Sequence, residues 1–194
     1  MRTKLCQAAL ELLAEVGYER VTAVLISERA KVSKGAQTHH FPSKADMLAG
    51  AFEHLLEGWK VRRAEFVESH GGRASLDQAL RYLWDKVFSR RDYIAAIELM
   101  LAARHEEALR ERLQGQLATW TVARDDMFRR VAGLDGDLKR TATFLQLNFC
   151  VLRGMAIYDS LSARVDDNAA ILELWISMAK QHIEQAGRSA SKKA

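Results

Sequence analysis

The segment Leu25–Leu48, LISERAKVSKGAQTHHFPSKADML, decides how this chain should fold. Its pattern predicts a helix that ends near Ala30, a tight turn over residues 31–33 and a short helix that ends near His40. Pro42 then breaks the helix, because proline disfavours helical backbone at the preceding residue and has no N–H group to donate. A helix, a tight turn and a short helix in this order are the layout of a helix-turn-helix.

Serines stand where the helices of this segment should begin. Ser33 is expected to cap the short helix and Ser43 the helix that follows, with Asp46 as the acidic third residue of a capping box. Upstream, an apolar stripe predicts a helix over residues 3–16, which Gly17 should end.

The short helix carries a small polar surface of the kind that reads base edges in the DNA major groove. Gly35 and Ala36 are small enough to let the backbone approach a duplex. Gln37 would pair with adenine through its amide, and Thr38 would offer a hydroxyl and a methyl group to bases. The residues expected to contact DNA are Thr22, Ser33, Lys34, Gly35, Ala36, Gln37, Thr38, His39, His40 and Lys44.

Phosphate contacts are expected from Lys44, which stands at the start of a helix whose first N–H groups are free. His39 and His40 can hydrogen-bond phosphates or bases, or one of them can pack beside Phe41. They make poor joint metal ligands, because adjacent helical residues point about 100° apart.

Composition indicates an all-helical chain of one or two compact domains. The 194 residues are 48% hydrophobic and include a single proline. The formal net charge of +4 permits nucleic-acid binding without requiring it. No apolar run approaches the ~20 residues that a membrane span needs. Glu11 and Glu15 interrupt the N-terminal apolar stretch, so we expect no secretory signal, no membrane partner and a cytoplasmic location.

The two cysteines, Cys6 and Cys150, are expected to be buried, reduced thiols. No metal-ligand spacing involves them, and no metal or cofactor is expected. The chain has no glycine-rich phosphate loop, no paired-carboxylate motif and no Ser-His-Asp order, so we expect no enzyme.

The region after the linker His70–Arg73 is predicted to be a series of helices. They are expected over about residues 76–90, capped by Ser75, 92–104, capped by Asp92, 106–131, 137–161 and 167–185, with Gly133 to Gly136 ending the third.

The last two of these helices are strongly apolar and are expected to form a dimer interface. Dimerisation also follows from DNA reading, because one short helix covers few base pairs and two-fold dimers read palindromes. The alternative is that these apolar stripes face only the subunit's own core. The interface residues expected are Phe149, Leu152, Met155, Ile171, Leu174, Trp175 and Met178.

Aromatic and polar residues of the middle helices are candidates for a cavity that takes a small, largely apolar molecule. The same aromatics would equally serve to fill a core. Arg153 lies in an apolar helix and needs a partner, either an acid such as Glu98 or an anionic ligand. The candidates are Trp59, Phe66, Trp84, Phe88, Met100, Arg104, His105, Trp120, Phe144, Asn148 and Arg153.

Residues 5–56 resemble the DNA-binding domain of the TetR family of bacterial transcription regulators. The matching residues are Ala8, Ala9, Leu12, Gly17, Tyr18, Thr22, Ile26, Ala30, Val32, Ser33, Gly35, His40, Phe41, Ser43, Lys44 and Leu48. The resemblance implies that the helix after Ser33 enters the major groove. It also implies a helical ligand-binding domain that dimerises through its last two long helices.

Two departures from the family pattern, one at Lys31 and one at the pair Gln37-Thr38, bear on DNA recognition. Lys31 stands in the turn where the family usually has glycine, and a lysine at positive φ costs on the order of 1 kcal/mol more than glycine. Gln37-Thr38 replaces a frequent apolar-Tyr pair, whose tyrosine often touches the DNA backbone. These departures indicate a distinct operator preference.

The fold expected is therefore all-α, with about nine helices. Residues 1–48 form the helix-turn-helix DNA-binding domain, residues 49–187 the effector-binding and dimerisation domain, and residues 188–194 a flexible tail. The function expected is that of a homodimeric repressor released from a palindromic operator on double-stranded DNA by a small-molecule effector. A helical ligand-carrying or protein-interaction module is the alternative, and activation in place of repression is a third possibility.

Overall fold

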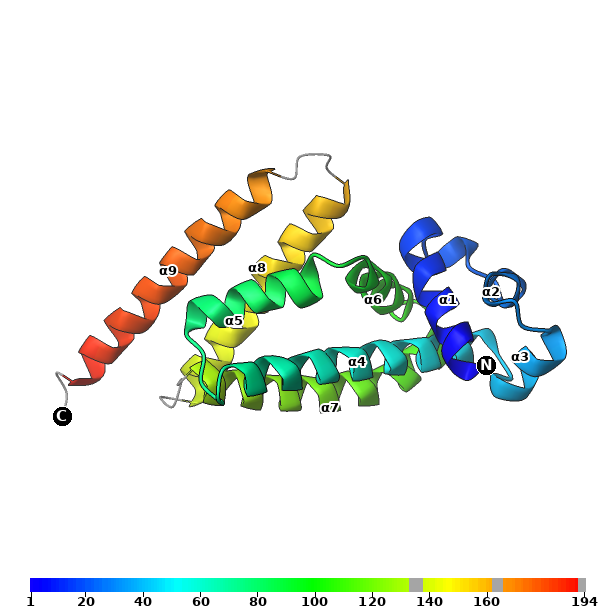
Figure 1. The fold of residues 1–194 in the computed structure, drawn as a ribbon, viewed down its shortest axis with the longest axis horizontal. Helices are drawn as coiled ribbons and strands as arrows, with labels where there is room; N and C mark the ends of the chain where they lie inside the picture. Colours follow the sequence, from blue (N-terminus) through cyan, green and yellow to red (C-terminus); the bar gives the residue numbers. More distant parts are fainter. Residues whose placement is uncertain (133–137, 162–165, 192–194) are drawn as a thin grey trace. The chain divides into compact units, whose positions relative to one another are not determined.

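The chain is all-helical in a computed structural model that describes residues 1–132, 138–161 and 166–191 (Figure 1). Over those residues it contains nine α-helices and two short helical segments of other types, with no strand. The elements are α1 Arg2–Val16, the 3-10 turn η1 Tyr18–Arg20, α2 Ala23–Ala30, α3 Lys34–His40, α4 Lys44–Ser69, α5 Leu76–Leu83, the π-helical η2 Trp84–Phe88, α6 Arg91–Ala102, α7 Glu107–Ala132, α8 Leu138–Leu161 and α9 Asp166–Ser191. None of the helices within these ranges is long and apolar enough to cross a membrane.

The chain divides into two compact units. Unit 1 comprises Met1–Glu65 and Arg90–Asp126, and unit 2 comprises Phe66–Ser89 and Met127–Ala194. The helix-turn-helix therefore shares a unit with α6 and with most of α4 and α7. The division of function at residue 48 stays a prediction.

The caps predicted at Ser33 and Ser43 are confirmed, and Thr22 caps α2 in the same way. The Thr22 hydroxyl accepts a hydrogen bond from the Leu25 N–H at 3.1 Å, and the Ser33 hydroxyl accepts one from the Ala36 N–H at 3.3 Å. The Ser43 hydroxyl accepts from the Asp46 N–H at 3.0 Å and donates to the Asp46 carboxylate at 2.6 Å. These bonds fix where α2, α3 and α4 begin.

Unit 1 has its core where α1 packs against α2 and α6 (Figure 1). Leu5, Leu12 and Ile26 are fully buried there. Gly17 ends α1 at φ +74°, and a side chain at that position would also crowd Glu98, whose carboxylate lies 3.3 Å from the place of a Cβ. The Tyr18 N–H donates to that same carboxylate at 2.9 Å, so α6 holds the corner between α1 and η1.

Unit 2 is joined by polar contacts between its helices. Arg81 on α5 forms a bidentate pair with Glu173 on α9. Helices α8 and α9 run antiparallel, because residues further along α9 meet residues further back on α8. The contacts that show this are Asn168 with Asp159, Trp175 with Asn148 and His182 with Phe144.

Three predicted helix boundaries need correction. The helix expected over residues 76–90 changes to π-helical hydrogen bonding at Trp84, whose carbonyl accepts from the Ser89 N–H at 2.9 Å. Helix α6 begins at Arg91, so Asp92 lies within its first turn and is not its cap. Helix α9 continues to Ser191, into the segment expected to be a tail. Gly133 to Gly136 and residues 192–194 lie outside the described residues.

Candidate nucleic-acid interface and effector region

The turn between α2 and α3 is closed by a lysine in the left-handed region. Lys31 has φ 54° and ψ 46°, and its N–H donates to the carbonyls of Ser27 and Glu28. The Val32 N–H also bonds to the Ser27 carbonyl, at 3.0 Å. Lys31 is the only residue other than glycine with positive φ over the described part of the chain, so the strain inferred from the sequence lies in this turn.

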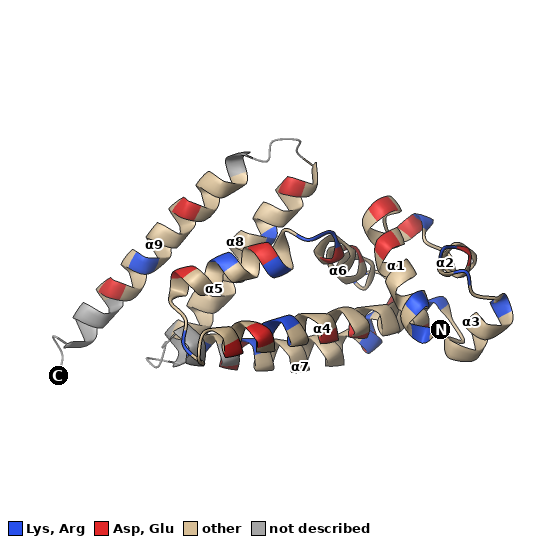
Figure 2. Ribbon diagram, viewed as in Figure 1, with Lys and Arg blue, Asp and Glu red and all other residues tan. Residues whose placement is uncertain are grey.

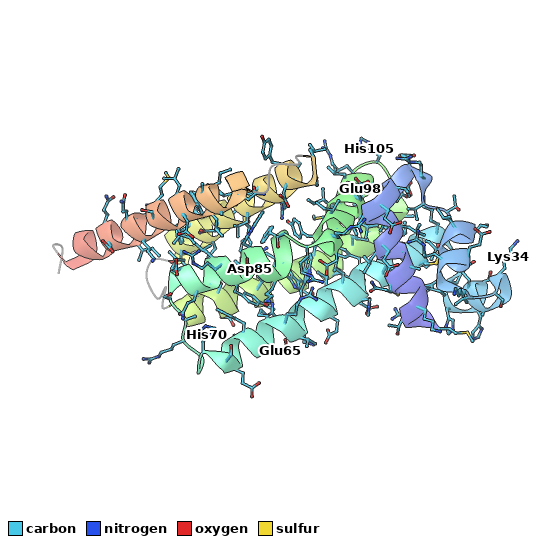
Figure 3. The ribbon with its side chains drawn as sticks, turned by 45° about the horizontal axis from the view of Figure 1, so that its top comes forward. Lys34, Glu65, His70, Asp85, Glu98 and His105 are labelled. Carbon is cyan, nitrogen blue, oxygen red and sulfur yellow. The ribbon has the colours of Figure 1, made fainter. Side chains whose placement is uncertain are left out.

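The outward face of α3 is open and polar. Lys34, Gly35, Thr38 and His39 are exposed, and they fall on one side of the helix because Thr38 and His39 lie one turn after Lys34 and Gly35. A Cβ at Gly35 would have no neighbour within 4 Å. Figure 3 shows Lys34 projecting from the outer end of α3. Ala36 and His40 are half-buried at the margin of this face.

Gln37 does not lie on this face. Its side chain is buried, and its amide nitrogen donates to the Phe41 carbonyl at 2.9 Å. The expectation that Gln37 reads adenine is therefore wrong for this structure, because the amide is turned inward and donates to the carbonyl of Phe41, the C-cap of α3. Gln37 holds the end of the helix where Phe41 enters the core.

Lys44 begins α4 and lies close to an aromatic ring. Its ammonium nitrogen is 4.1 Å from the centroid of the Tyr18 ring. Burial raises the pKa of the Tyr18 hydroxyl, and a hydrogen bond to Glu106 raises it further. The contact between the Lys44 ammonium and the Tyr18 ring keeps the half-buried Lys44 beside the first N–H groups of α4.

Two further residues of the expected DNA-contact set cap helices. Thr22 and Ser33 are exposed, yet their hydroxyls cap α2 and α3. The His39 and His40 rings meet edge to face at 5.5 Å. Figure 2 shows basic residues at the starts of α1 and α3 and acidic residues towards the end of α1.

The effector candidates fall into both units. In unit 1, the Trp59 ring lies 5.3 Å from the Trp120 ring and 5.7 Å from that of Tyr93. Met100 is half-buried. Arg104 and His105 are exposed on the turn after α6, where Figure 3 shows His105. The expectation that Arg104 and His105 line a cavity is not supported by this exposure.

In unit 2 the aromatic candidates are core residues. Phe66 stacks on Tyr82, and Phe88 stacks on Phe149 at 6.1 Å. Trp84 is buried with them. The expected alternative, that these aromatics fill a core, describes their packing.

The polar candidates of unit 2 lie on α8. The buried Asn148 donates to the Phe144 carbonyl at 2.6 Å and accepts from the Trp175 indole at 3.0 Å. Arg153 is half-buried. Glu98, the acid suggested from the sequence as its partner, accepts a hydrogen bond from the Tyr18 N–H.

A groove of about 500 Å³ runs between α8 and α9. It is lined by Thr143, Phe144, Leu147, Trp175, Met178, Ala179, Gln181, His182 and Gln185. Large apolar side chains on the same two helices are exposed, namely Leu147, Ile157, Tyr158, Leu161, Ile171, Leu174 and Met178. An exposed apolar surface of this extent is typical of an interaction site.

The expected interface residues divide between the two helices. Ile171, Leu174 and Met178 on α9 are exposed, and Trp175 is half-buried, as an interface would require. Phe149, Leu152 and Met155 on α8 are buried within the single chain, so their assignment to an interface is wrong. The α8 stripe chosen from the sequence is the inner one.

The cysteines also differ from expectation in one respect. Cys6 is buried, and burial raises the pKa of its thiol. Cys150 is exposed, on the outer side of α8, where the prediction had a buried thiol.

Comparison with known proteins identifies the N-terminal pattern. Residues 5–51 match the model for bacterial regulatory proteins of the tetR family. The HTH-type transcriptional regulator CymR of Pseudomonas putida is 34% identical over 160 residues, which cover 79% of this chain and 76% of CymR. This chain belongs to the TetR family. It is a transcriptional regulator of the helix-turn-helix type.

Solved structures share the fold at lower identity. A transcriptional regulator from Rhodococcus sp. Rha1 matches with a TM-score of 0.72 at 22% identity, over 94% of this chain and 97% of that one. The multidrug binding protein EbrR, solved in complex with imidazole, matches with a TM-score of 0.61 at 21% identity, over 92% and 93% of the two chains.

Membership of the TetR family also accounts for the position of Gln37. The pair Gln37-Thr38 stands where the family frequently has an apolar residue followed by tyrosine, so position 37 belongs to the inward side of α3. That pattern was the available signal for its burial. The contact between Tyr18 and Glu98 had no such signal, because 80 residues separate the two.

Proposed function

We propose that this TetR-family regulator is a homodimeric repressor that binds a palindromic operator and is released by a small-molecule effector. The exposed face of α3 is the observation that carries the proposal. Lys34 and His39 offer hydrogen-bonding groups to solvent, and Gly35 leaves the backbone uncovered beside them. The Thr38 hydroxyl donates to the Lys34 carbonyl at 3.0 Å, so Thr38 offers bases its hydroxyl lone pairs and its methyl group.

Phosphate binding is assigned to the elements around α3. Lys34 is exposed, and Lys44 stands at the start of α4, a helix end that favours anions, where Ser43 caps the Asp46 N–H. Such contacts fix the position and orientation of a protein on the duplex but carry no sequence information. Thr38 and His39 are then the candidates for base contacts.

A second copy of the chain is the proposed occupant of the exposed apolar surface on α8 and α9. Leu147, Ile157 and Leu161 lie on one side of α8, and Leu174 and Met178 on one side of α9, all of them exposed. Two such helices from each of two chains would bury these side chains in a four-helix interface. The dimer would also present two copies of α3 to two half-sites about one turn of DNA apart.

Effector release needs a ligand that binds the two states of the regulator with different affinity. The structural relative EbrR is named as a multidrug binding protein and was solved with imidazole. By analogy with that relative, a small molecule is the proposed effector here. Repression in place of activation is proposed on the same family basis, since a repressor needs only to occupy its operator.

Selection of bound duplexes from a random DNA pool tests the proposal. We expect a palindromic winner bound about 10³-fold or more tightly than scrambled DNA at physiological salt. Sedimentation of the complex is expected to show two chains on one duplex. Weak binding that is indifferent to sequence, or one chain on a non-palindromic site, would contradict the proposal.

A further inference from the structure

Unit 1 contains buried polar side-chain atoms that have no hydrogen-bond partner in the described part of the chain. They are the indole nitrogens of Trp59 and Trp120, Gln116 Oε1, Arg62 Nε, Arg63 Nη1 and Asp92 Oδ1. Protein interiors leave few such groups unpaired, because each one has given up its bonds to water. Four of the six are donors, namely the two indole nitrogens, Arg62 Nε and Arg63 Nη1, so their concentration in one unit indicates a place where a ligand supplies acceptors.

These atoms lie on faces of α4 and α7 that approach each other. Trp59 on α4 is 5% exposed, and its ring centroid is 5.3 Å from that of Trp120 on α7. Arg63 lies one turn after Trp59, and Gln116 lies one turn before Trp120. The Gln116 amide nitrogen donates to the Ala49 carbonyl at 3.5 Å, which ties the two helices together and leaves its oxygen unpaired.

Positive charge exceeds negative charge among these residues. Arg62 pairs with Asp92 at 3.2 Å, and Arg124 pairs with Asp125 at 2.6 Å. Arg63 has no ion-pair partner among the residues that the structure describes, although one of its guanidinium nitrogens is buried. Arg63 as a whole is half-buried, and a guanidinium nitrogen that is shut off from water and unpaired favours binding of an anion.

We propose that this part of unit 1 binds a small organic anion. Its carboxylate would accept hydrogen bonds from the Trp59 and Trp120 indoles and from Arg63, and its apolar body would lie against the same rings. Two N–H donors and a guanidinium group match an acceptor with two oxygens. The proposal rests on the proposed function, since it names the class of effector that the regulator would answer to.

The same site has a physical route to the DNA-binding elements. Asp92, the partner of Arg62, lies in the first turn of α6. Glu98, further along that helix, accepts the hydrogen bond from the Tyr18 N–H at the corner after α1. A ligand that alters the Arg62–Asp92 pair therefore acts on the helix that holds this corner.

Thermal unfolding of the full chain with matched probes tests the site. The probes are phenylacetate and octanoate at millimolar concentration, with phenylacetamide and octanamide as uncharged twins. We expect at least one of the two carboxylates to raise the Tm of the protein. The corresponding amide should leave Tm unchanged. The apparent affinity of the protein for that carboxylate should fall about tenfold or more in each of the variants Trp59→Phe, Trp120→Phe and Arg63→Gln. Trp84→Phe in unit 2 is the matched control and should leave it unchanged.

Indole fluorescence keeps the test decisive if a variant folds poorly. The chain has four tryptophans, so Trp84→Phe/Trp175→Phe leaves only Trp59 and Trp120 to report. Carboxylate binding should change their emission. No response to either carboxylate, equal responses to the amides, or wild-type affinity in Arg63→Gln would overturn the proposal. Binding of the selected duplex, measured in parallel, shows separately whether the proposed regulatory function stands.

Discussion

The tight packing of Gly50 against Phe41 makes residue 50 intolerant of a side chain. A Cβ on Gly50 would lie 2.5 Å from Cε1 of the Phe41 ring, and Phe41 is buried at the end of α3. Gly50→Ala should therefore displace the ring and lower the free energy of unfolding by about 1–3 kcal/mol in urea denaturation.

Gly115→Ala is the matched control, because a Cβ there would have no neighbour within 4 Å. It should raise the free energy of unfolding by roughly 0.5–1 kcal/mol, the usual gain from replacing glycine inside a helix. Equal effects of the two substitutions would mean that Phe41 does not constrain residue 50.

The backbone conformation of Lys31 also leads to a prediction about stability. At φ 54° it occupies a conformation that glycine adopts more easily, and Lys31→Gly should stabilise the protein by about 1 kcal/mol in urea. Its side chain is exposed, so little packing is lost. A lower stability of the variant would show that the lysine side chain holds the turn.

Asp46 links acid stability to the helix-turn-helix. The hydrogen bond from the Ser43 hydroxyl, and then that from Arg112 at 2.9 Å, hold the pKa of Asp46 below its ordinary value. Its stabilising effect is thus present above the unfolded pKa of about 3.9 and is lost as the pH falls through the folded pKa.

Asp46→Asn should consequently lower the free energy of unfolding at pH 7 by about 0.5–1 kcal/mol, the range of a partly exposed ion pair. The difference from wild type should shrink below about pH 4, where the wild-type carboxylate gains its proton. Urea denaturation at pH 7 and pH 3 measures it. A difference that is constant with pH would contradict the assignment.

The starts and ends of helices in this segment were predictable from the sequence, because they depend on residues that cap or break a helix. The direction in which a side chain points was less predictable. Ser33 and Ser43 cap the expected helices because their chemistry acts on the adjacent backbone. Gln37 was placed outward because its amide suits adenine, and the structure turns it to the Phe41 carbonyl. Cys150 was expected inside because cysteines usually are.

At the scale of the element, α8 carries two stripes that the sequence alone did not separate. Phe149, Leu152 and Met155 form the buried stripe. Leu147, Cys150 and Leu161 belong to the exposed one. Both are apolar at helical spacing, so periodicity marks them as a wide face and only the packing of the chain divides them.

Cys150 therefore reports on the proposed dimer. With α8 buried in a homodimer, its thiol should react with a maleimide at least about tenfold more slowly at micromolar protein than after dilution to monomer, since reagent access depends on exposure. Leu174→Glu, which places a charge in the proposed interface, should restore fast labelling at micromolar protein. Cys6→Ser removes the second thiol from the measurement. Equal rates in all conditions would place Cys150 outside any interface.

The π-helical segment η2 shows what local patterns miss. Residues 84–88 contain neither glycine nor proline, so nothing in the sequence indicates an interruption after α5. The wider turn buries Trp84, Val87 and Phe88 together. Its cause is tertiary packing of large side chains, which periodicity does not contain.

At the scale of the whole molecule, the all-helical fold and the family followed from signals within short stretches. The pairing of α6 with α1 did not, because Glu98 and Tyr18 are distant in sequence. This pairing places α6 in the same compact unit as the helix-turn-helix. From the sequence we expected the DNA-binding domain to end at residue 48, where the DNA-binding pattern gives way to a pattern of long helices.

The central claim is that the exposed face of α3 lies against DNA, and Gly35→Leu tests it most directly. No atom lies within 4 Å of a Cβ at this position, so the variant should fold with unchanged or higher Tm. Its bulk would hold α3 away from the bases. Fluorescence anisotropy with the selected palindromic duplex should show a loss of about 10³-fold, to the level of scrambled DNA. Wild-type affinity in Gly35→Leu would contradict the account.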